Sequence, residues 1–291
     1  MRGMSIRENL AHMKKILLLL LGFILIIPAV VTAAGCAGPV KNIRQMKSAT
    51  ENLQSIIQSK LLNLDNAVAN AAEKIAKSGI QGEETRGILN GLCRKYPYLT
   101  DCSTSDPQGK MITVAPEAYR QYEGTETAIT DASKQFFADF AQNRKPMLSN
   151  VFRAVEGVDA VVLVRPVITE DGVLLGMVSA LFKPGDLLDG TIAPAAEVRA
   201  MKVNVAQTDG LTIYCSNGLE TGKNLLTDPR YVNYPELEAM GKKMVAQQTG
   251  SAEYTFISDT TGRPVKKAAV WTTLALHGTE WRLVSIAELE N

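Results

Sequence analysis

Apolar residues recur at steps of three and four positions between residues 43 and 80, a stretch with no proline and no glycine before Gly79. The members of this stripe are Met46, Leu53, Ile56, Ile57, Leu61, Leu64, Val68, Ala71 and Ile75. The spacing predicts a helix of roughly 30–35 residues, which is long for a globular protein. The apolar face of this helix can pack against either of two partners. We favour the chain's own domains; the alternative is the same helix of a second copy in a homodimer.

Behind this helix, a similar succession of strands, turns and helices occurs twice. In the first half we expect a helix over 83–96, a strand over 111–114, a helix over 130–143 and a hairpin of strands 160–168 and 173–182. In the second half we expect strands over 202–206 and 211–215, a helix over 235–248, and strands over 250–257, 266–274 and 280–287.

The repeated pattern predicts an α+β fold class. A long N-terminal helix over 37–82 is followed by two tandem modules with central antiparallel sheets, one over 83–195 and one over 196–291.

The first 36 residues have the layout of a secretory signal. Lys14 and Lys15 precede an apolar run over 16–31, and small residues then lead to Cys36. We expect residues 1–36 to be a lipoprotein-type signal peptide and Cys36 to carry the lipid. The alternative is that 16–34 is retained as a single N-terminal transmembrane anchor. Both interpretations place the rest of the chain on the extracytoplasmic face of the cell membrane.

Composition and charge exclude several function classes. The chain has 31 Lys and Arg against 30 Asp and Glu, a balance that argues against a nucleic-acid partner. Its two histidines, His12 and His277, leave no metal-ligand cluster and no Ser-His-Asp or Cys-His arrangement. We therefore expect no enzyme activity, no metal and no cofactor, and we expect His277 in an exposed hairpin turn.

Three cysteines follow the signal. In an oxidising compartment Cys93 and Cys102 can form a disulfide, and two free thiols are the equal alternative. Cys215 is then left as a half-buried thiol in a strand.

Seven short segments, in order, carry a resemblance to a known family. They are Lys145-Pro146-x-x-Ser149, Arg165 to Ile168, Asp171 to Gly176, Gln207 to Tyr214, Gly222 to Leu226, Gly250 to Tyr254 and Glu280 to Val284. In this order the chain resembles a double Cache sensor domain, the extracytoplasmic PAS-like tandem of prokaryotic receptors. The resemblance implies a ligand in the membrane-distal module, which is the first of the two, and a membrane-proximal second module.

The amino-acid-sensing branch of that family has a motif Arg-x-Trp-Tyr before the Lys-Pro turn, which falls on Lys134, Phe136 and Phe137 here. A later tyrosine of the branch falls on Phe152, and the aspartate that anchors the ligand's amine falls on Leu181. Because that acid is lost, the resemblance implies that an ordinary α-amino acid does not bind.

We expect a small anionic, organic-acid-type ligand instead. Lys134 and Arg165 would hold its charge, and phenylalanines would form an apolar wall. Ser149, Asn150 and Tyr122 are the polar candidates. The alternatives are that Phe136 and Phe137 are core residues and that Lys134 is a solvated side chain.

The sequence therefore favours a small-molecule-binding sensor lipoprotein. Because the sequence carries no recognisable output domain, we expect it to signal through a membrane receptor or transporter partner. The alternative function is a structural envelope lipoprotein with vestigial pockets, which filled pockets without a buried cation would indicate. In the proximal module Tyr214, Tyr231, Tyr254 and Trp271 are expected to pack on the sheet rather than line a second pocket.

Overall fold

The structure, a computed structural model, describes residues 42–127, 130–195 and 200–289. The expected signal peptide and Cys36 lie outside these residues. Helix α2 spans Ile43–Ser78, and its first turn is capped by the side chain of Asn42, which accepts a hydrogen bond from Gln45 N at 3.0 Å. No helix among the described residues is both long enough and apolar enough to cross a membrane.

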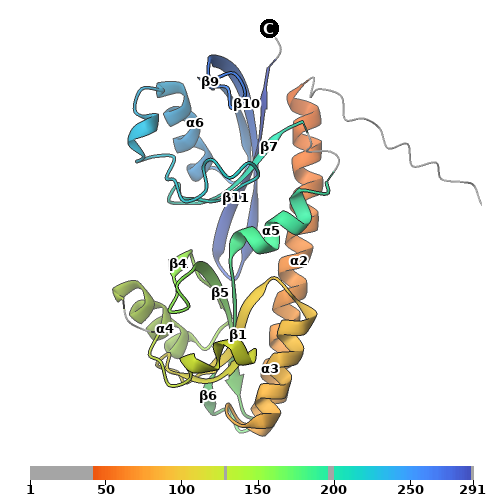
Figure 1. Cartoon of the computed structure of the whole chain (residues 1–291), viewed down its shortest axis with the longest axis vertical. Helices are drawn as coiled ribbons and strands as arrows, with labels where there is room; N and C mark the ends of the chain where they lie inside the picture. Colours follow the sequence, from red (N-terminus) through yellow and green to blue (C-terminus); the bar gives the residue numbers. More distant parts are fainter. Residues whose placement is uncertain (1–41, 128–129, 196–199, 290–291) are drawn as a thin grey trace, which may run out of the picture. The chain divides into compact units, whose positions relative to one another are not determined.

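Helix α2 buries its apolar stripe against the chain's own sheets, as favoured above (Figure 1). Ile56 is the exception, with 49% of its surface exposed. Polar contacts reinforce the packing: Thr50 Oγ1 donates to Ser285 Oγ at 2.8 Å, and Gln58 exchanges two hydrogen bonds with the backbone of Ala275. The buried part of the stripe is therefore covered within the chain, and a homodimer through the long helix stays a prediction.

The first sheet has six strands: β1 (Leu99–Ser105), β2 (Met111–Ala115), β3 (Met147–Leu148), β4 (Phe152–Arg153), β5 (Asp159–Ile168) and β6 (Leu174–Phe182). Their order is β2-β1-β6-β5-β3, and β4 pairs with β5. All pairings are antiparallel. Helices α2 and α3 (Glu83–Lys95) pack against this sheet. Helix α4 (Asp131–Asn143) packs on the opposite face, where Phe140 is fully buried with Val164 and Met177. The segment between β2 and α4 includes the short helix η1 (Glu117–Tyr122).

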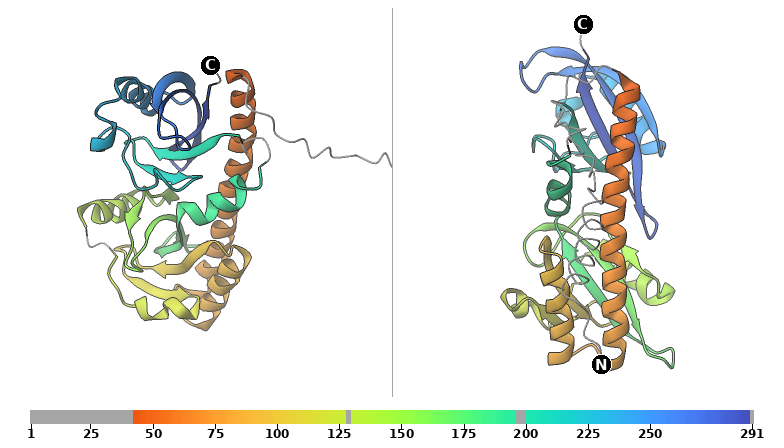
Figure 2. Two further views of the ribbon diagram at one scale, coloured as in Figure 1. Left: turned by 45° about the horizontal axis from the view of Figure 1, so that its top comes forward. Right: turned by 90° about the vertical axis from the view of Figure 1, so that its right-hand side faces the viewer.

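The second sheet has five antiparallel strands in the order β8-β7-β11-β10-β9. They are β7 (Lys202–Gln207), β8 (Thr212–Cys215), β9 (Gly250–Ile257), β10 (Pro264–Leu276) and β11 (Thr279–Glu288). Helix α6 (Pro235–Ala246) covers one face, and the short helix η3 is Pro229–Tyr231. Leu237, Met240 and Met244 of α6 pack on Trp271, and α2 contacts β10 and β11 on the other side (Figure 2).

The predicted α+β architecture is confirmed, and the structure adds elements that were not predicted, among them β1 and α5. The sequence analysis missed β1, because Leu-Thr-Asp-Cys-Ser-Thr-Ser is polar although the strand is almost wholly buried. It also missed α5 (Pro184–Ile192), which follows the turn at Lys183. Helix α5 contacts the second module, where the Tyr214 hydroxyl donates to Asp189 Oδ1 at 2.8 Å.

The thiols of Cys93, on α3, and Cys102, on β1, lie side by side, with their sulfur atoms 2.6 Å apart. Burial and the hydrogen bond with Cys93 raise the pKa of the Cys102 thiol. Cys215 is buried, rather than half-buried as expected, and it contacts Asn217 Oδ1 at 2.8 Å. The disulfide itself stays a prediction.

Candidate functional site

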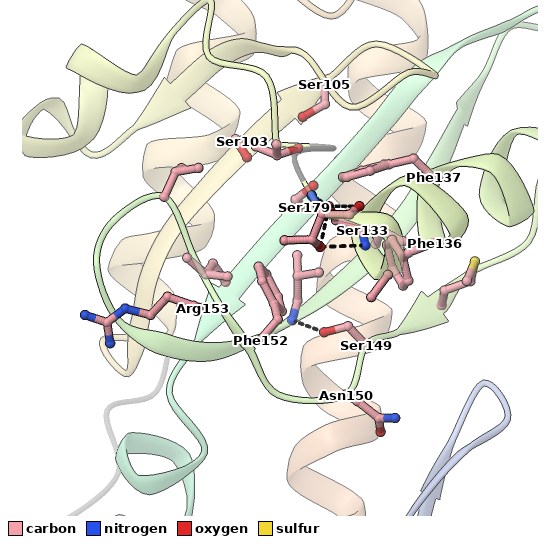
Figure 3. A pocket seen from close by; sticks show the side chains of 18 of the residues that line it. Ser103, Ser105, Ser133, Phe136, Phe137, Ser149, Asn150, Phe152, Arg153 and Ser179 are labelled. Atoms are coloured by element: carbon pink, nitrogen blue, oxygen red, sulfur yellow. Dashed lines mark hydrogen bonds between the residues drawn. The ribbon is translucent and has the colours of Figure 1, made fainter. Parts of the chain in front are cut away.

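A cavity of about 420 Å³ lies in the first module between helix α4, the sheet and the segment over 149–156 (Figure 3). Strands β1, β5 and β6 form its floor. Helix α4 forms one wall, and the segment 149–156 forms the rim. This volume is within the range of small-molecule sites, which are usually about 300–1,000 Å³.

Phenylalanines supply the apolar part of the cavity. Phe136 and Phe137 come from α4 and meet edge to face, with ring centroids 5.5 Å apart, and Phe152 comes from the rim. A capping box of Thr130 and Ser133 begins α4 and therefore sets where this helix starts above the sheet.

Glycine is required beneath one of these rings. Gly109 has φ +93°, and a Cβ there would lie 2.8 Å from the Phe137 ring. The absence of a side chain lets the ring close onto the turn before β2.

The polar floor comes mainly from β1. Alternate residues of this strand, Asp101, Ser103 and Ser105, line the cavity because side chains of a strand alternate between its faces. Ser103 pairs with Ser179 of β6, and Asp101 pairs with Leu181.

The carboxyl group of Asp101 has an unusual environment. Its residue is 1% exposed, and Oδ2 has no hydrogen-bond partner among the described residues. Burial, followed by the neighbouring carboxyl of Glu156, raises the pKa of Asp101 well above its ordinary value. Burial also raises the pKa of Glu156. A buried acid pair without a cation is energetically costly unless it holds a proton or a ligand.

The rim is held by the second module. Ser149 Oγ accepts a hydrogen bond from Val162 N at 2.9 Å, which fixes the start of the rim to β5. Val151 N donates to Gln207 Oε1 at 2.6 Å, and the carbonyl of Leu148 accepts from Thr279 Oγ1 at 2.5 Å. The cavity is thus tied through its rim to strands β7 and β11.

The structure brings together five of the residues expected at the site. Phe136, Phe137, Ser149 and Phe152 all line the cavity, and so does Asn150. Their role in ligand binding stays a prediction.

Three other expected residues lie outside the lining. The side chain of Lys134 is 62% exposed on the outer face of α4, where it lies 3.9 Å from Asp131. Tyr122 stacks on Tyr119 at a centroid distance of 6.3 Å. Both are therefore wrong as cavity residues.

Arg165 is the third expected residue that lies outside the cavity lining. Val162 and Val164 of β5 face the cavity, so Arg165 points to the other face of the sheet. There it forms a bidentate ion pair with Asp65 of α2, at 2.8 and 2.5 Å. Arg165 therefore does not line the cavity, and its charge is already paired within the protein.

His277 lies in the exposed hairpin turn where it was expected, and its side chain also joins this cluster. Its side chain is 19% exposed, and Nε2 lies 2.8 Å from Asp65 Oδ1. It occupies the tip of the β10–β11 hairpin with φ 51°, next to Gly278.

Sequence reasoning missed Asp101 and Glu156. Asp101 lies in a stretch for which no strand was predicted, although the alternation Asp-x-Ser-x-Ser over 101–105 is a readable strand signal. Nothing in the sequence pointed to Glu156, because its position depends on how the rim folds back over β1.

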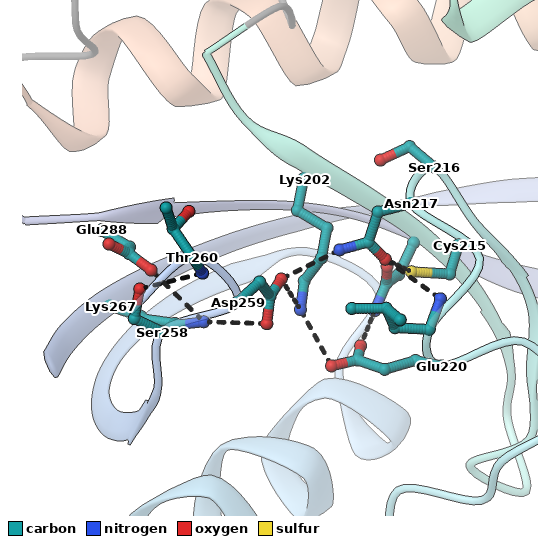
Figure 4. A network of polar contacts seen from close by, with 12 residues as sticks. Lys202, Cys215, Ser216, Asn217, Glu220, Ser258, Asp259, Thr260, Lys267 and Glu288 are labelled. Carbon is teal, nitrogen blue, oxygen red and sulfur yellow. Dashed lines mark hydrogen bonds and ion pairs between the residues drawn. The ribbon is translucent and has the colours of Figure 1, made fainter. Parts of the chain in front are cut away.

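Among its described residues the proximal module has no cavity of comparable volume. Its cavity is about 30 Å³, roughly the volume of one water molecule, and Tyr231 and Tyr254 are among its lining residues. Beside it, Lys202 pairs with Glu220 at 2.8 Å and with Asp259 at 3.2 Å (Figure 4). This network satisfies its own charges, so the distal cavity is the candidate site.

Comparison with known proteins agrees with this arrangement. Residues 59–184 match the family model of the HK/GC/Chemotaxis protein-like sensor domain. An extracellular ligand binding receptor from Desulfohalobium retbaense is 27% identical, with a TM-score of 0.68 over 84% of this chain. The chain has the double Cache sensor fold.

Two further double Cache structures share the fold at lower identity. The ligand-binding domain of the Pseudomonas fluorescens chemoreceptor CtaA, in complex with L-isoleucine, is 14% identical with a TM-score of 0.60, covering 84% of this chain and 91% of that one. The ligand binding domain of the Pseudomonas aeruginosa amino acid chemoreceptor PctB, in complex with L-Arg, is 13% identical with a TM-score of 0.57, covering 84% and 96%. This double Cache chain spans 41% of the Desulfohalobium protein. No curated protein matches the sequence.

Proposed function

We propose that this double Cache protein is an extracytoplasmic sensor that binds one small molecule in the distal cavity. The observation that carries the proposal is the cavity of about 420 Å³, which joins a phenylalanine wall to a buried carboxyl with an unpartnered oxygen. An apolar pocket with a few convergent polar groups is the usual form of a ligand site. The amino acids held by the CtaA and PctB domains support a ligand of that size class.

The anionic ligand expected from the sequence is replaced in this proposal. That expectation depended on Lys134 and Arg165, and neither side chain lines the cavity. The acids Asp101 and Glu156 do line it, and an anion beside them would be repelled.

The rim is the proposed route from ligand to signal. A ligand that contacts Ser149, Asn150 or Val151 bears on the same segment that Gln207 holds from the second module. A ligand that binds the protein more tightly when the rim is in one of two positions would increase the population of that position. A membrane partner would detect the shift. Anchorage through a lipid on Cys36, or through the retained apolar segment 16–34, would keep the sensor at the membrane surface.

A thermal-shift screen of the purified protein tests the function. Amines, amino acids, organic acids and purines are applied to the wild type, to Ser179→Phe, which fills the cavity floor, and to Lys134→Ala, which lies outside it. We expect one class to raise Tm by several degrees in the wild type and in Lys134→Ala but not in Ser179→Phe. Circular dichroism checks that Ser179→Phe is folded. If no class stabilises the wild type, the sensor proposal fails and the structural envelope lipoprotein takes its place.

A further inference from the structure

The charged residues that line the cavity restrict the chemical class of the ligand more than the shape of the cavity does. Among the described residues that line it, Arg153 is the one Lys or Arg. Its guanidinium points away from the cluster of cavity side chains and pairs with Asp159 at 3.2 Å, with 66% of the side chain exposed (Figure 3). No lining cation therefore balances the acids on the floor.

Asp101 on the floor and Glu156 on the rim are neighbouring acids. Asp101 is almost completely buried and leaves Oδ2 without a partner, and the nearby carboxyl of Glu156 helps to raise its pKa. Two neighbouring carboxyl groups hold a proton between them when nothing else neutralises them. An oxygen that accepts no hydrogen bond inside the protein is free to accept one from a ligand.

The other titratable groups near Asp101 add no positive charge that could neutralise it. The Cys93 thiol of α3 approaches it from behind the sheet and adds no positive charge. Across the cavity, Asp139 of α4 accepts a hydrogen bond from Gln135 at 2.7 Å and adds a further acid. Within the described residues, no group of three or more His, Cys, Asp or Glu could hold a metal ion. An organic cation fits this set of groups.

We propose that the distal cavity binds a small primary amine without a carboxylate, whose ammonium group donates to Oδ2 of Asp101 and displaces the proton held by Asp101 and Glu156. The proposal rests on the distal cavity being the ligand site. The amine's apolar body lies against Phe136 and Phe152. A carboxylate on the ligand would find no unpaired Lys or Arg in the lining. The proton that leaves the acid pair goes to solvent, so binding strengthens as pH rises.

Asp101 takes the place of the ligand-anchoring aspartate that this chain lacks at position 181. The amino-acid-sensing branch places its aspartate where this chain has Leu181, on β6. Asp101 is the direct cross-strand partner of Leu181, from β1. Cross-strand partners have Cβ atoms about 4.5–5.5 Å apart, so a carboxylate from β1 reaches the same part of the cavity. In this proposal Asp101 supplies the counter-charge that Leu181 does not.

Matched ligands test the proposal in calorimetry on the purified protein. The probes are isoamylamine and 2-phenylethylamine, each beside the alcohol and the carboxylate of the same carbon skeleton, and L-phenylalanine. We expect an amine to bind at least tenfold more tightly than its alcohol, its carboxylate and the amino acid. Affinity should rise between pH 5.5 and 8, and the heat should depend on the ionisation enthalpy of the buffer because a proton is released.

Asp101→Asn is the decisive variant, and Asp131→Asn, an exposed residue of α4 outside the cavity, is its matched control. Asp101→Asn should weaken amine binding at least tenfold and abolish the proton release, while Asp131→Asn changes neither. Equal binding of the alcohol or the carboxylate, or amine binding that survives Asp101→Asn, overturns the proposal. If neutral or anionic compounds from the thermal-shift screen bind and Ser179→Phe abolishes them, the proposed function stands and the amine proposal falls.

The stability of the ligand-free protein as a function of pH is a further test of the proposal. The raised pKa of Asp101 means that the folded state holds this proton more tightly than the unfolded chain. Stability of the free protein should therefore fall as pH rises from about 4, the ordinary pKa of Asp, through the raised value. Asp101→Asn should raise Tm at pH 8, and its Tm should converge with that of the wild type as pH falls to about 4. A Tm below that of the wild type at pH 8 contradicts the buried-acid account.

Discussion

Arg165 on strand β5 and Asp65 on helix α2 form a bidentate ion pair, with Nε 2.8 Å from Oδ1. His277, from the hairpin of the second module, lies 2.8 Å from the same Oδ1. One carboxylate thus contacts the first module and the second module from the helix that packs on both. Burial alone would raise the pKa of Asp65, but hydrogen bonds and charge from Arg165 and His277 outweigh it and lower that pKa.

Arg165→Ala should lower the free energy of unfolding by about 3 kcal/mol, because it leaves the buried carboxylate of Asp65 without its main partner. Urea denaturation at pH 7 measures the loss. Arg165→Lys should recover part of it, since an ammonium restores charge but not the two-pronged geometry. Lys134→Ala, an exposed cation of the same module, is the control and should have little effect. Equal stability of Arg165→Ala and the control would show that the pair contributes nothing.

The same pair predicts how stability changes in acid. The folded pKa of Asp65 is below its unfolded value, so its contribution is present above the unfolded pKa of about 3.9 and is lost as pH falls through the folded value. We expect the wild type to lose Tm steeply below about pH 4. Asp65→Asn should be less stable at pH 7 and lose less Tm over the same acidic range. Parallel curves for the two proteins would refute this linkage.

Gln207→Leu should loosen the rim of the cavity without touching the cavity itself. Val151 N would lose its acceptor at 2.6 Å, so its amide should exchange with deuterium at least tenfold faster. Hydrogen exchange followed by mass spectrometry on a peptide that covers 149–153 measures this change. Gln248→Leu, whose amide bonds to Glu280 on the surface, is the matched control. Unchanged exchange at the rim would mean that Gln207 does not hold it.

Gly109→Ala should destabilise the first module by about 1–3 kcal/mol, because it adds strain at a positive φ and a clash with Phe137. Gly87→Ala in α3 is the control. Its new methyl group meets nothing within 4 Å, and alanine favours a helix, so stability should rise by about 0.5–1 kcal/mol. Thermal unfolding compares the two variants. A neutral Gly109→Ala would mean that the Phe137 ring can move aside freely.

Cys93 and Cys102 should form a disulfide when the protein matures in an oxidising compartment, since their sulfur atoms lie side by side. Peptide mapping without reductant should find these two residues linked and Cys215 as a free thiol. Changing both to serine should lower the free energy of unfolding by about 2–3 kcal/mol, through loss of a short closed loop. Alkylation of both thiols in the unreduced, denatured protein would contradict the disulfide.

Periodic segments were predicted well from the sequence, and aperiodic ones were not. The stripe on α2 and the strands of the second module have one clear apolar face each, which is what periodicity detects. Strand β1 is buried with Asp101, Ser103 and Ser105 on it, because one of its faces borders a cavity rather than a core. Hydrophobic alternation cannot find such a strand. The polar residues that conceal it are the ones of functional interest.

The site was predicted in part for the same reason. Phe136, Phe137, Ser149 and Phe152 were placed by counting from a recognisable turn, and backbone spacing carries over to space along one helix and its following loop. Arg165 was misplaced because a strand has two faces, and only its neighbours decide which face meets the cavity. Lys134 was misplaced because it lies on the solvent side of α4.

The sequence by itself determined most of the elements and their order: a long amphipathic helix followed by two α+β modules. These depend on local periodicity and composition, which need no knowledge of distant contacts. Tertiary structure alone decided that the apolar stripe of α2 is covered by the chain's own sheets. It also decided that Asp65 neutralises Arg165, and that Asp101 meets Glu156 beneath an open cavity. Such charge pairings join residues far apart in the chain, and their energies depend on burial and distance, which only the folded protein defines.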